Sequence, residues 1–134
     1  MVNPGSQYFI VNKDTGTVLD CNEGNGWVRA WRQKGGDNQK WIIDRSGPRQ
    51  PWYLKNVATG KFLYRDDESS EGALRVDDQE HLWHVTGNDD EGFREGDGLF
   101  LDIKDANRDN DAIVLLYEKK GDNQVWYFRE GKIS

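Results

Sequence analysis

Apolar and polar residues alternate over short stretches of the chain, and Gly, Asp or Asn residues interrupt the alternation every few positions. Residues 8–12 (YFIVN) and 52–56 (WYLKN) are typical of these stretches. Alternation with a period of two predicts β-strands, and the interrupting residues predict turns. An apolar pattern of the form i, i+3, i+4, i+7 does not persist over ten residues. The chain is therefore predicted to be all-β, with few or no helices.

Three tryptophans recur along the chain at a nearly constant spacing. Trp41, Trp83 and Trp126 lie 42 and 43 residues apart. Two of them end near-identical strings, GDNQKW and GDNQVW, whereas the middle copy reads QEHLW. A turn residue also leads into a short apolar strand in each copy, at residues 15–20, 59–64 and 97–102. The period predicts a single domain over residues 1–134 with three repeats, at about 6–46, 50–87 and 92–131.

The repeat restricts the architecture to a few closed forms. Four short strands are expected in each repeat, which gives twelve in one domain. A propeller with one blade per repeat would have only three blades, fewer than the usual four to eight. Helical arrays of similar period need a helical pattern that is missing. A barrel with threefold pseudosymmetry and a cap of hairpins remains, so we predict a β-trefoil of three pseudo-symmetric four-strand repeats.

Charge and cysteine content narrow the partners and the location. The formal net charge is -6, and no Lys/Arg cluster interrupts the acidic balance. Nucleic acids and anionic membrane surfaces are therefore not expected as partners. The N-terminus lacks the features of a signal peptide, and no apolar run is long enough to insert into a membrane. Cys21 is the only cysteine, so a cytoplasmic location is expected, with signal-independent export left open.

The tryptophan strings resemble the Gln-x-Trp motif of the ricin B-type, or R-type, lectins. Residues 39–41 (QKW) and 124–126 (QVW) match the motif, and residues 81–83 (HLW) are a decayed copy. The resemblance covers nearly the whole chain, and the disulfide-free form is similar to the small fungal members. It implies a β-trefoil whose repeats can each bind a galactose-like sugar, while the motif tryptophan belongs to the core.

The resemblance also implies which residues would bind the sugar. In this family an Asp accepts hydrogen bonds from two sugar hydroxyls, an aromatic ring stacks on the sugar, an Asn contacts a hydroxyl and a Gln steadies the Asp. The matching residues of repeat one are Asp20, Trp31, Asn38 and Gln39. Those of repeat three are Asp102, Tyr117, Asn123 and Gln124. Repeat two has Tyr64 in place of the Asp and no Asn-Gln pair, so it is expected to be structural only.

The two expected sites differ from one another. Arg29 and Leu115 each stand two residues before the aromatic residue of their repeat, and they are expected to give the sites different preferences. The distance from Asp to Asn is 18 residues in repeat one and 21 in repeat three. The resemblance implies the function of a lectin or agglutinin for glycans bearing terminal galactose or N-acetylgalactosamine, and the differences between the repeats predict that its two sites are unequal. A homodimer would suit an agglutinin, and the oligomeric state is left open.

The chemistry of a pyranose fits these residue types. A carboxylate accepts two hydroxyls in charge-assisted bonds, and an amide supplies both a donor and an acceptor. An aromatic ring offers a flat apolar surface with little loss of side-chain entropy. A shallow, solvated site of this kind is expected to bind one sugar with a Kd of roughly millimolar to high micromolar. Two such sites on one rigid body would gain by avidity.

Two other functions remain open from the sequence. A β-trefoil protease inhibitor would act through an exposed loop, here residues 44–51 or 88–94, an inference from analogy of fold alone. The chain would alternatively be the targeting module of a separate enzyme or toxin. Catalysis is not expected, because no nucleophile motif is present and the carboxylate pairs at 66–67 and 89–90 lie in turn-like segments.

No metal ion or other cofactor is expected. Residues 105–109 copy the first ligand positions of an EF-hand loop, but Asn110 and Leu116 replace its Gly and Glu. His81 and His84 flank Trp83 with Asp77 nearby, which is too small a set for zinc.

Overall fold

The computed structural model describes residues 3–66, 74–85, 93–94, 100–117 and 124–130. The strands of these residues are β1 (Ser6–Asn12), β2 (Val18–Cys21), β3 (Trp27–Trp31), β4 (Trp41–Arg45), β5 (Trp52–Asn56), β6 (Phe62–Arg65), β7 (Leu74–Asp77), β8 (His84–Val85), β9 (Phe93–Arg94), β10 (Phe100–Ile103), β11 (Ala112–Tyr117) and β12 (Trp126–Glu130). Two short 3-10 helices lie between strands: η1 (Asp37–Gln39) between β3 and β4, and η2 (Lys104–Ala106) between β10 and β11. No helix in this described part is long and apolar enough to span a membrane.

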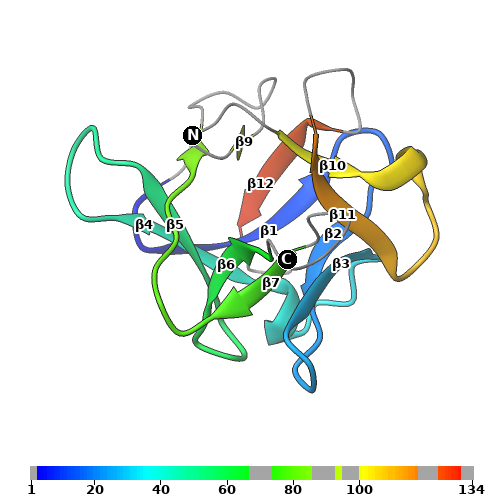
Figure 1. The fold of residues 1–134 in the computed structure, drawn as a ribbon, viewed down its shortest axis with the longest axis horizontal. Helices are drawn as coiled ribbons and strands as arrows, with labels where there is room; N and C mark the ends of the chain where they lie inside the picture. Colours follow the sequence, from blue (N-terminus) through cyan, green and yellow to red (C-terminus); the bar gives the residue numbers. More distant parts are fainter. Residues whose placement is uncertain (1–2, 67–73, 86–92, 95–99, 118–123, 131–134) are drawn as a thin grey trace.

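Strands β1, β4, β5, β8, β9 and β12 form a barrel (Figure 1). β1 pairs antiparallel with β4 and with the last strand, β12, and β4 pairs with β5. A bridge between Trp52 and Trp83 joins β5 to the start of β8, which pairs with β9. The first and last strands of the chain are therefore neighbours in the barrel wall.

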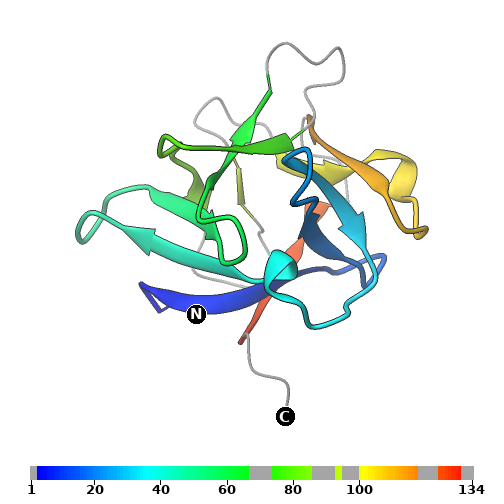
Figure 2. The ribbon, with the colours of Figure 1, turned by 90° about the horizontal axis from the view of Figure 1, so that it is seen from below.

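The remaining strands form three hairpins, β2–β3, β6–β7 and β10–β11, that gather at one end of the barrel (Figures 1 and 2). β3 pairs with β7 through Trp27 and Arg75, and with β11 through Arg29 and Ile113. Each hairpin thus comes from a different third of the chain. A barrel closed by three hairpins around a pseudo-threefold axis is a β-trefoil, and the predicted fold is confirmed.

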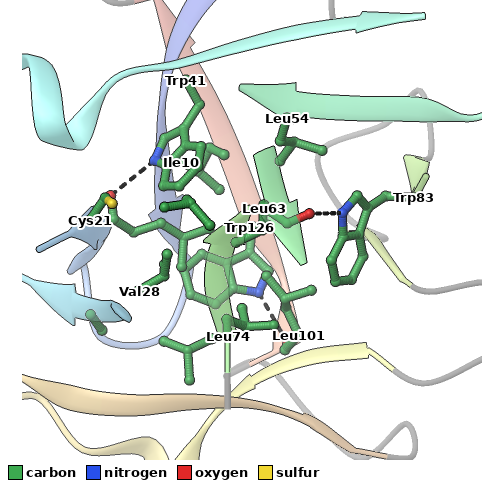
Figure 3. Packing of buried hydrophobic residues seen from close by; sticks show 14 of the residues in the cluster. Ile10, Cys21, Val28, Trp41, Leu54, Leu63, Leu74, Trp83, Leu101 and Trp126 are labelled. Carbon is green, nitrogen blue, oxygen red and sulfur yellow. Dashed lines mark hydrogen bonds between the residues drawn. The ribbon is translucent and has the colours of Figure 1, made fainter. Parts of the chain in front are cut away.

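The three repeated tryptophans lie in the core, where each is at most 2% exposed (Figure 3). Their indole Nε1 atoms donate to the carbonyl oxygens of Leu19, Leu63 and Leu101 at 3.1, 3.0 and 3.1 Å. These leucines lie in the second strand of each repeat, directly before residues 20, 64 and 102. The buried indole therefore satisfies a buried carbonyl and fixes the strand that presents the next side chain.

Two equivalent turns lead from the first to the second strand in repeats one and two. The backbone N–H of Gly16 donates to Asn12 O at 2.9 Å, and that of Gly60 donates to Asn56 O at 2.8 Å. Both glycines have positive φ angles, 73° and 69°, a conformation that glycine adopts without a steric penalty. The buried Asn12 and Asn56 side chains accept backbone N–H groups of the same turns. These asparagines thus fix the chain direction entering β2 and β6.

Candidate functional site

Asp20, Asn38 and Gln39 meet at the end of β2 and form what we call site one. Asn38 Nδ2 donates to Asp20 Oδ1 at 3.2 Å, and Gln39 Nε2 donates to Asp20 Oδ2 at 2.9 Å. Asn38 and Gln39 reach the carboxylate from η1, 18 and 19 residues further along the chain. The structure therefore brings together three of the four residues of repeat one that the sequence singles out, with one amide on each carboxylate oxygen.

Gln39 is held in one orientation by its own partners. Its Oε1 atom accepts the backbone N–H groups of Lys34 and Gly35 at 2.7 and 3.3 Å. Its Nε2 atom also donates to Arg32 O at 2.9 Å. Because the oxygen must face two N–H donors, the amide nitrogen must face Asp20. Gln39 is only 1% exposed, so it contacts the carboxylate from the buried side.

An open pocket of ≈ 590 Å³ lies above these groups. It is lined by residues 20–24, Trp31, Lys34, Gly36 and Asn38. The half-buried Trp31 thus joins Asp20 and Asn38 around one concave surface. The pocket offers a ring, a carboxylate and an amide to one small ligand, and its volume lies within the usual range of small-molecule sites.

Lys34 is a pocket residue that the sequence interpretation missed. Its Nζ atom lies 5.3 Å from the centroid of the Trp31 ring, a cation–π contact at an exposed position. A sequence signal was available, because a Lys-Gly pair follows three residues after the aromatic residue in repeat one and again in repeat three. Lys34 adds a flexible donor to the rim of site one.

The surroundings of Asp20 raise the pKa of its carboxyl group. Burial of the carboxylate raises its pKa above the ordinary value of 3.8, because desolvation disfavours the charged form. Hydrogen bonds from Gln39 and Asn38 and the charge of Lys34 act in the opposite direction without cancelling the effect. The folded chain therefore bears a desolvation cost for keeping this carboxylate charged.

Repeat two supplies a brace for site one. Asn56 of β5 is fully buried, and its Nδ2 atom donates to Asn38 O at 3.0 Å and to Lys40 O at 3.5 Å. The N–H group of Val57 also donates to Lys40 O at 3.0 Å. The turn that carries Asn38 and Gln39 is thus held from the next repeat. In repeat one, the N–H of Lys13 donates to Val125 O at 2.8 Å in the same manner.

Arg29 lies beside site one but outside its pocket. It pairs with Asp20 across the β2–β3 hairpin, yet it is not among the residues that line the pocket. Its guanidinium lies 5.6 Å from the centroid of the Trp27 ring, two residues earlier on the same face of β3. The structure therefore places the Arg29 guanidinium against the Trp27 ring.

Repeat three contains the same hydrogen bond between a buried Gln and the Asp carboxylate. Gln124 Nε2 donates to Asp102 Oδ2 at 2.7 Å, and both residues are at most 3% exposed. Leu115 lies opposite Asp102 in the β10–β11 hairpin, and Tyr117, which is 45% exposed, lies opposite Phe100. Asn123 lies outside the described residues. Asp102 is thus more deeply buried than Asp20, and the two repeats differ in geometry as well as in sequence.

Repeat two replaces the Asp–Gln contact with a stack of two rings. Tyr64 and His81, which stand at the positions of Asp20 and Gln39, lie with ring centroids 4.9 Å apart and planes at 27°. His81 Nε2 contacts Asp77 Oδ2 at 3.0 Å, and this hydrogen bond lowers the pKa of Asp77. Aromatic stacking therefore occupies the space in which the other repeats place a carboxylate and its amide.

The other candidate features of the sequence contribute less. No group of three or more His, Cys, Asp and Glu side chains able to hold a metal ion occurs in the part of the chain that the structure describes. Within residues 105–109, Arg108 Nη2 forms an ion pair with Asp14 Oδ1 at 3.2 Å, and the Asp109 N–H donates to Asn107 Oδ1. Loop 44–51 is half-buried to exposed, and most of loop 88–94 lies outside the described residues.

Comparison with models of known protein families finds a match for this chain. A family model described as ricin-type β-trefoil lectin domain-like matches residues 2–76, more than half of the 134 residues. The chain belongs to this family. The match includes all the site-one residues and Asn56, so the ricin-type assignment rests on the part of the chain in which the site geometry is described. A comparison with curated protein sequences finds no match.

Solved structures agree with the ricin-type fold over nearly the whole chain. The Rhizoctonia solani agglutinin is 26% identical, with a TM-score of 0.85 over 97% of this chain and 98% of its own. The Macrolepiota procera ricin B-like lectin, solved in complex with lactose, is 21% identical, with a TM-score of 0.85 over 97% and 99%. The C-terminal half of an earthworm R-type lectin, in complex with N-acetylgalactosamine, is 21% identical, with a TM-score of 0.73 over 93% and 98%.

Proposed function

We propose that this ricin-type protein is a lectin that binds terminal galactose or N-acetylgalactosamine through two unequal sites, in repeats one and three. Repeat two serves the structure and binds no sugar of its own. The observation that carries the proposal is the Asp20 carboxylate, held by Asn38 and Gln39 at the base of an open pocket beside Trp31.

The geometry of site one fits a sugar. A carboxylate oxygen has two lone pairs, so each oxygen of Asp20 can accept a hydroxyl in addition to its amide partner. Adjacent sugar hydroxyls then bind the carboxylate while the C–H face of the ring contacts Trp31. Binding rather than catalysis is proposed because amide groups engage both carboxylate oxygens, and amides neither supply nor remove protons.

The choice of sugar rests on related structures. The Macrolepiota lectin was solved with lactose and the earthworm lectin with N-acetylgalactosamine. A further structural neighbour, SeviL, which matches this chain with a TM-score of 0.69, was solved with the asialo-GM1 saccharide. These ligands support a galactose-type preference for the present chain.

A glycan array followed by calorimetric titration tests the proposal. We expect galactose- and N-acetylgalactosamine-terminated glycans to bind, with two sites per chain and a Kd of roughly millimolar to high micromolar for a single sugar. Protease inhibition assays on the same preparation address the loop-based alternative. Absence of glycan binding would refute the lectin function, and a third site would refute the structural role of repeat two.

The brace from repeat two gives a second expectation. Replacing Asn56 by Ser keeps a side-chain acceptor for its own turn but removes the donor that reaches Asn38 O and Lys40 O. We expect the free energy of unfolding to fall by about 1–3 kcal/mol and site one to weaken more than the site in repeat three. NMR titration with a monosaccharide resolves the two sites.

Asn12→Ser is the matched control, because Asn12 holds the equivalent turn in repeat one. It should cost a similar amount of stability while leaving the affinity of site one unchanged. Equal effects of both substitutions on site one would show that Asn56 acts only through general stability.

A further inference from the structure

A second depression lies on the other side of the β2–β3 turn from the site-one pocket. It has a volume of ≈ 440 Å³ and is lined by residues 23–26, residues 58–59, Lys61, Arg75 and Val76. Glu23 and Gly24 line both depressions, so a single turn separates them. We call this second depression the turn pocket.

Its walls come from two repeats that are fastened to one another. The N–H of Val76 donates to Gly26 O, and Arg75 Nη2 donates to Asn25 O, each at 2.9 Å. Gly26 has a φ of 78°, and a Cβ atom there would lie 3.6 Å from Val76 Cγ2. Glycine therefore lets the turn close onto β7 in a backbone conformation that other residues rarely adopt. The turn pocket is a defined feature of the fold.

The lining is rich in groups that suit hydroxyls. The Lys61 side chain is 48% exposed, and its Nζ atom lies 3.8 Å from Oδ1 of the exposed Asp78. An exposed ion pair of this length is weak, so the ammonium group can turn to a ligand. Glu23 supplies a carboxylate acceptor on the shared rim, and Thr59 supplies a hydroxyl. No aromatic side chain lines the pocket among the described residues. Such a lining would hold a ligand by hydrogen bonds rather than by stacking.

We propose that the turn pocket is a subsite for the inner sugar units of a linear oligosaccharide whose terminal sugar occupies site one. The inference rests on the proposed function of site one and adds the path of the glycan to it. Gly24, which has no side chain, lies on the rim shared by the two pockets. In this proposal the glycan crosses the turn at Gly24 and meets Lys61 and Thr59 beyond it.

The subsite predicts a dependence on glycan length. Methyl β-galactoside fills only site one, whereas a neutral galactose-terminated tetrasaccharide also reaches the turn pocket. One or two additional hydrogen bonds correspond to an affinity gain of about three- to tenfold. Comparing both probes in the Asp102→Asn variant restricts the measurement to site one.

Lys61→Met removes the ammonium group but keeps the length of the side chain. We expect the advantage of the tetrasaccharide to fall to within about twofold of the monosaccharide, because the donor that reaches the inner sugars is lost. The affinity for methyl β-galactoside should not change. Lys55→Met is the matched control, since Lys55 is a lysine of β5 that lines neither pocket. It should preserve the full advantage.

NMR gives a direct readout of the same contact. The tetrasaccharide should shift the backbone amide signals of Ala58, Thr59 and Lys61, and methyl β-galactoside should leave them in place. Equal affinities for the two probes, with these signals unmoved while the site-one signals shift, would overturn the subsite and leave the lectin function intact. Absence of binding by both probes would overturn the function of site one and the subsite with it.

Discussion

The Asp20→Asn/Asp102→Asn double variant should lose glycan binding while remaining folded. Each carboxylate is expected to accept two sugar hydroxyls in charge-assisted bonds, which contribute about 1.5–3 kcal/mol each. Asparagine keeps the size of the side chain but offers one acceptor and turns an N–H₂ group towards amide donors. We expect each site to weaken by at least about tenfold, which takes a weak site beyond detection on a glycan array.

Tyr64→Phe is the matched control, because Tyr64 occupies the equivalent position in repeat two. It should bind glycans as the unmodified chain does. Single Asp variants should each remove one of the two calorimetric sites. Retention of full binding by the double variant would show that the sugar is held elsewhere on the molecule.

The pH dependence of site one follows from the same carboxylate. The ionised form binds the sugar, and its pKa lies above 3.8 in the folded chain. Binding at site one should therefore decline as pH falls through this raised pKa, at a higher pH than for an ordinary Asp. Fold stability behaves in the opposite sense, because a raised folded-state pKa means that the charged group opposes folding at neutral pH and protonation relieves this cost. Removing the charge should thus not unfold the protein.

Trp83→Ala should be the most destabilising of the substitutions considered. Trp83 is 2% exposed and donates to Leu63 O, so its loss leaves both a cavity and an unpaired buried carbonyl. We expect the free energy of unfolding to fall by about 3–5 kcal/mol and the melting temperature by about 10 °C or more. Thermal and urea unfolding followed by tryptophan fluorescence and circular dichroism measure the change.

Repeat two makes this substitution informative, since it is expected to carry no sugar site. The folded fraction of Trp83→Ala should bind glycans with unchanged affinity, which separates a core role from a binding role. The neighbouring Leu82 is 53% exposed, so Leu82→Ala should change stability by no more than about 0.5 kcal/mol. A small effect of Trp83→Ala would contradict the core assignment.

The fold and the grouping of Asp20, Asn38 and Gln39 could be predicted from the sequence. Trp41, Trp83 and Trp126 persist where the other motif residues are lost, which is expected of residues that the core requires. The joint loss of the Asp and the Asn-Gln pair in repeat two indicates linked roles, and the family resemblance implies that Gln39 steadies Asp20. Such features recur at a fixed period, and a period is visible in a linear sequence.

Features that depend on packing between repeats, or on the direction taken by a long side chain, could not be predicted. Asn56 reads as a turn residue of repeat two, and only the paired strands show that it reaches the η1 turn of repeat one. Arg29 shares a face of β3 with Trp27 and Trp31, and alternation cannot tell which ring a long, flexible side chain approaches. The turn pocket likewise exists only because Gly26 and Val76, 50 residues apart in sequence, lie against one another.

The brace from Asn56 means that the sequence repeat and the complete binding site do not have the same boundaries. A module cut between the repeats would carry Asp20, Asn38 and Gln39 away from the side chain that supports their turn. A module running from β2 through β5 would keep them together. Recombination or engineering that transplants a working site between proteins of this kind should therefore succeed when the crossovers fall within the first turn of each repeat. β1 and β12 pair with each other in the barrel. The same rule therefore applies at the chain ends: a circular permutation should also place its new termini within the first turn of a repeat.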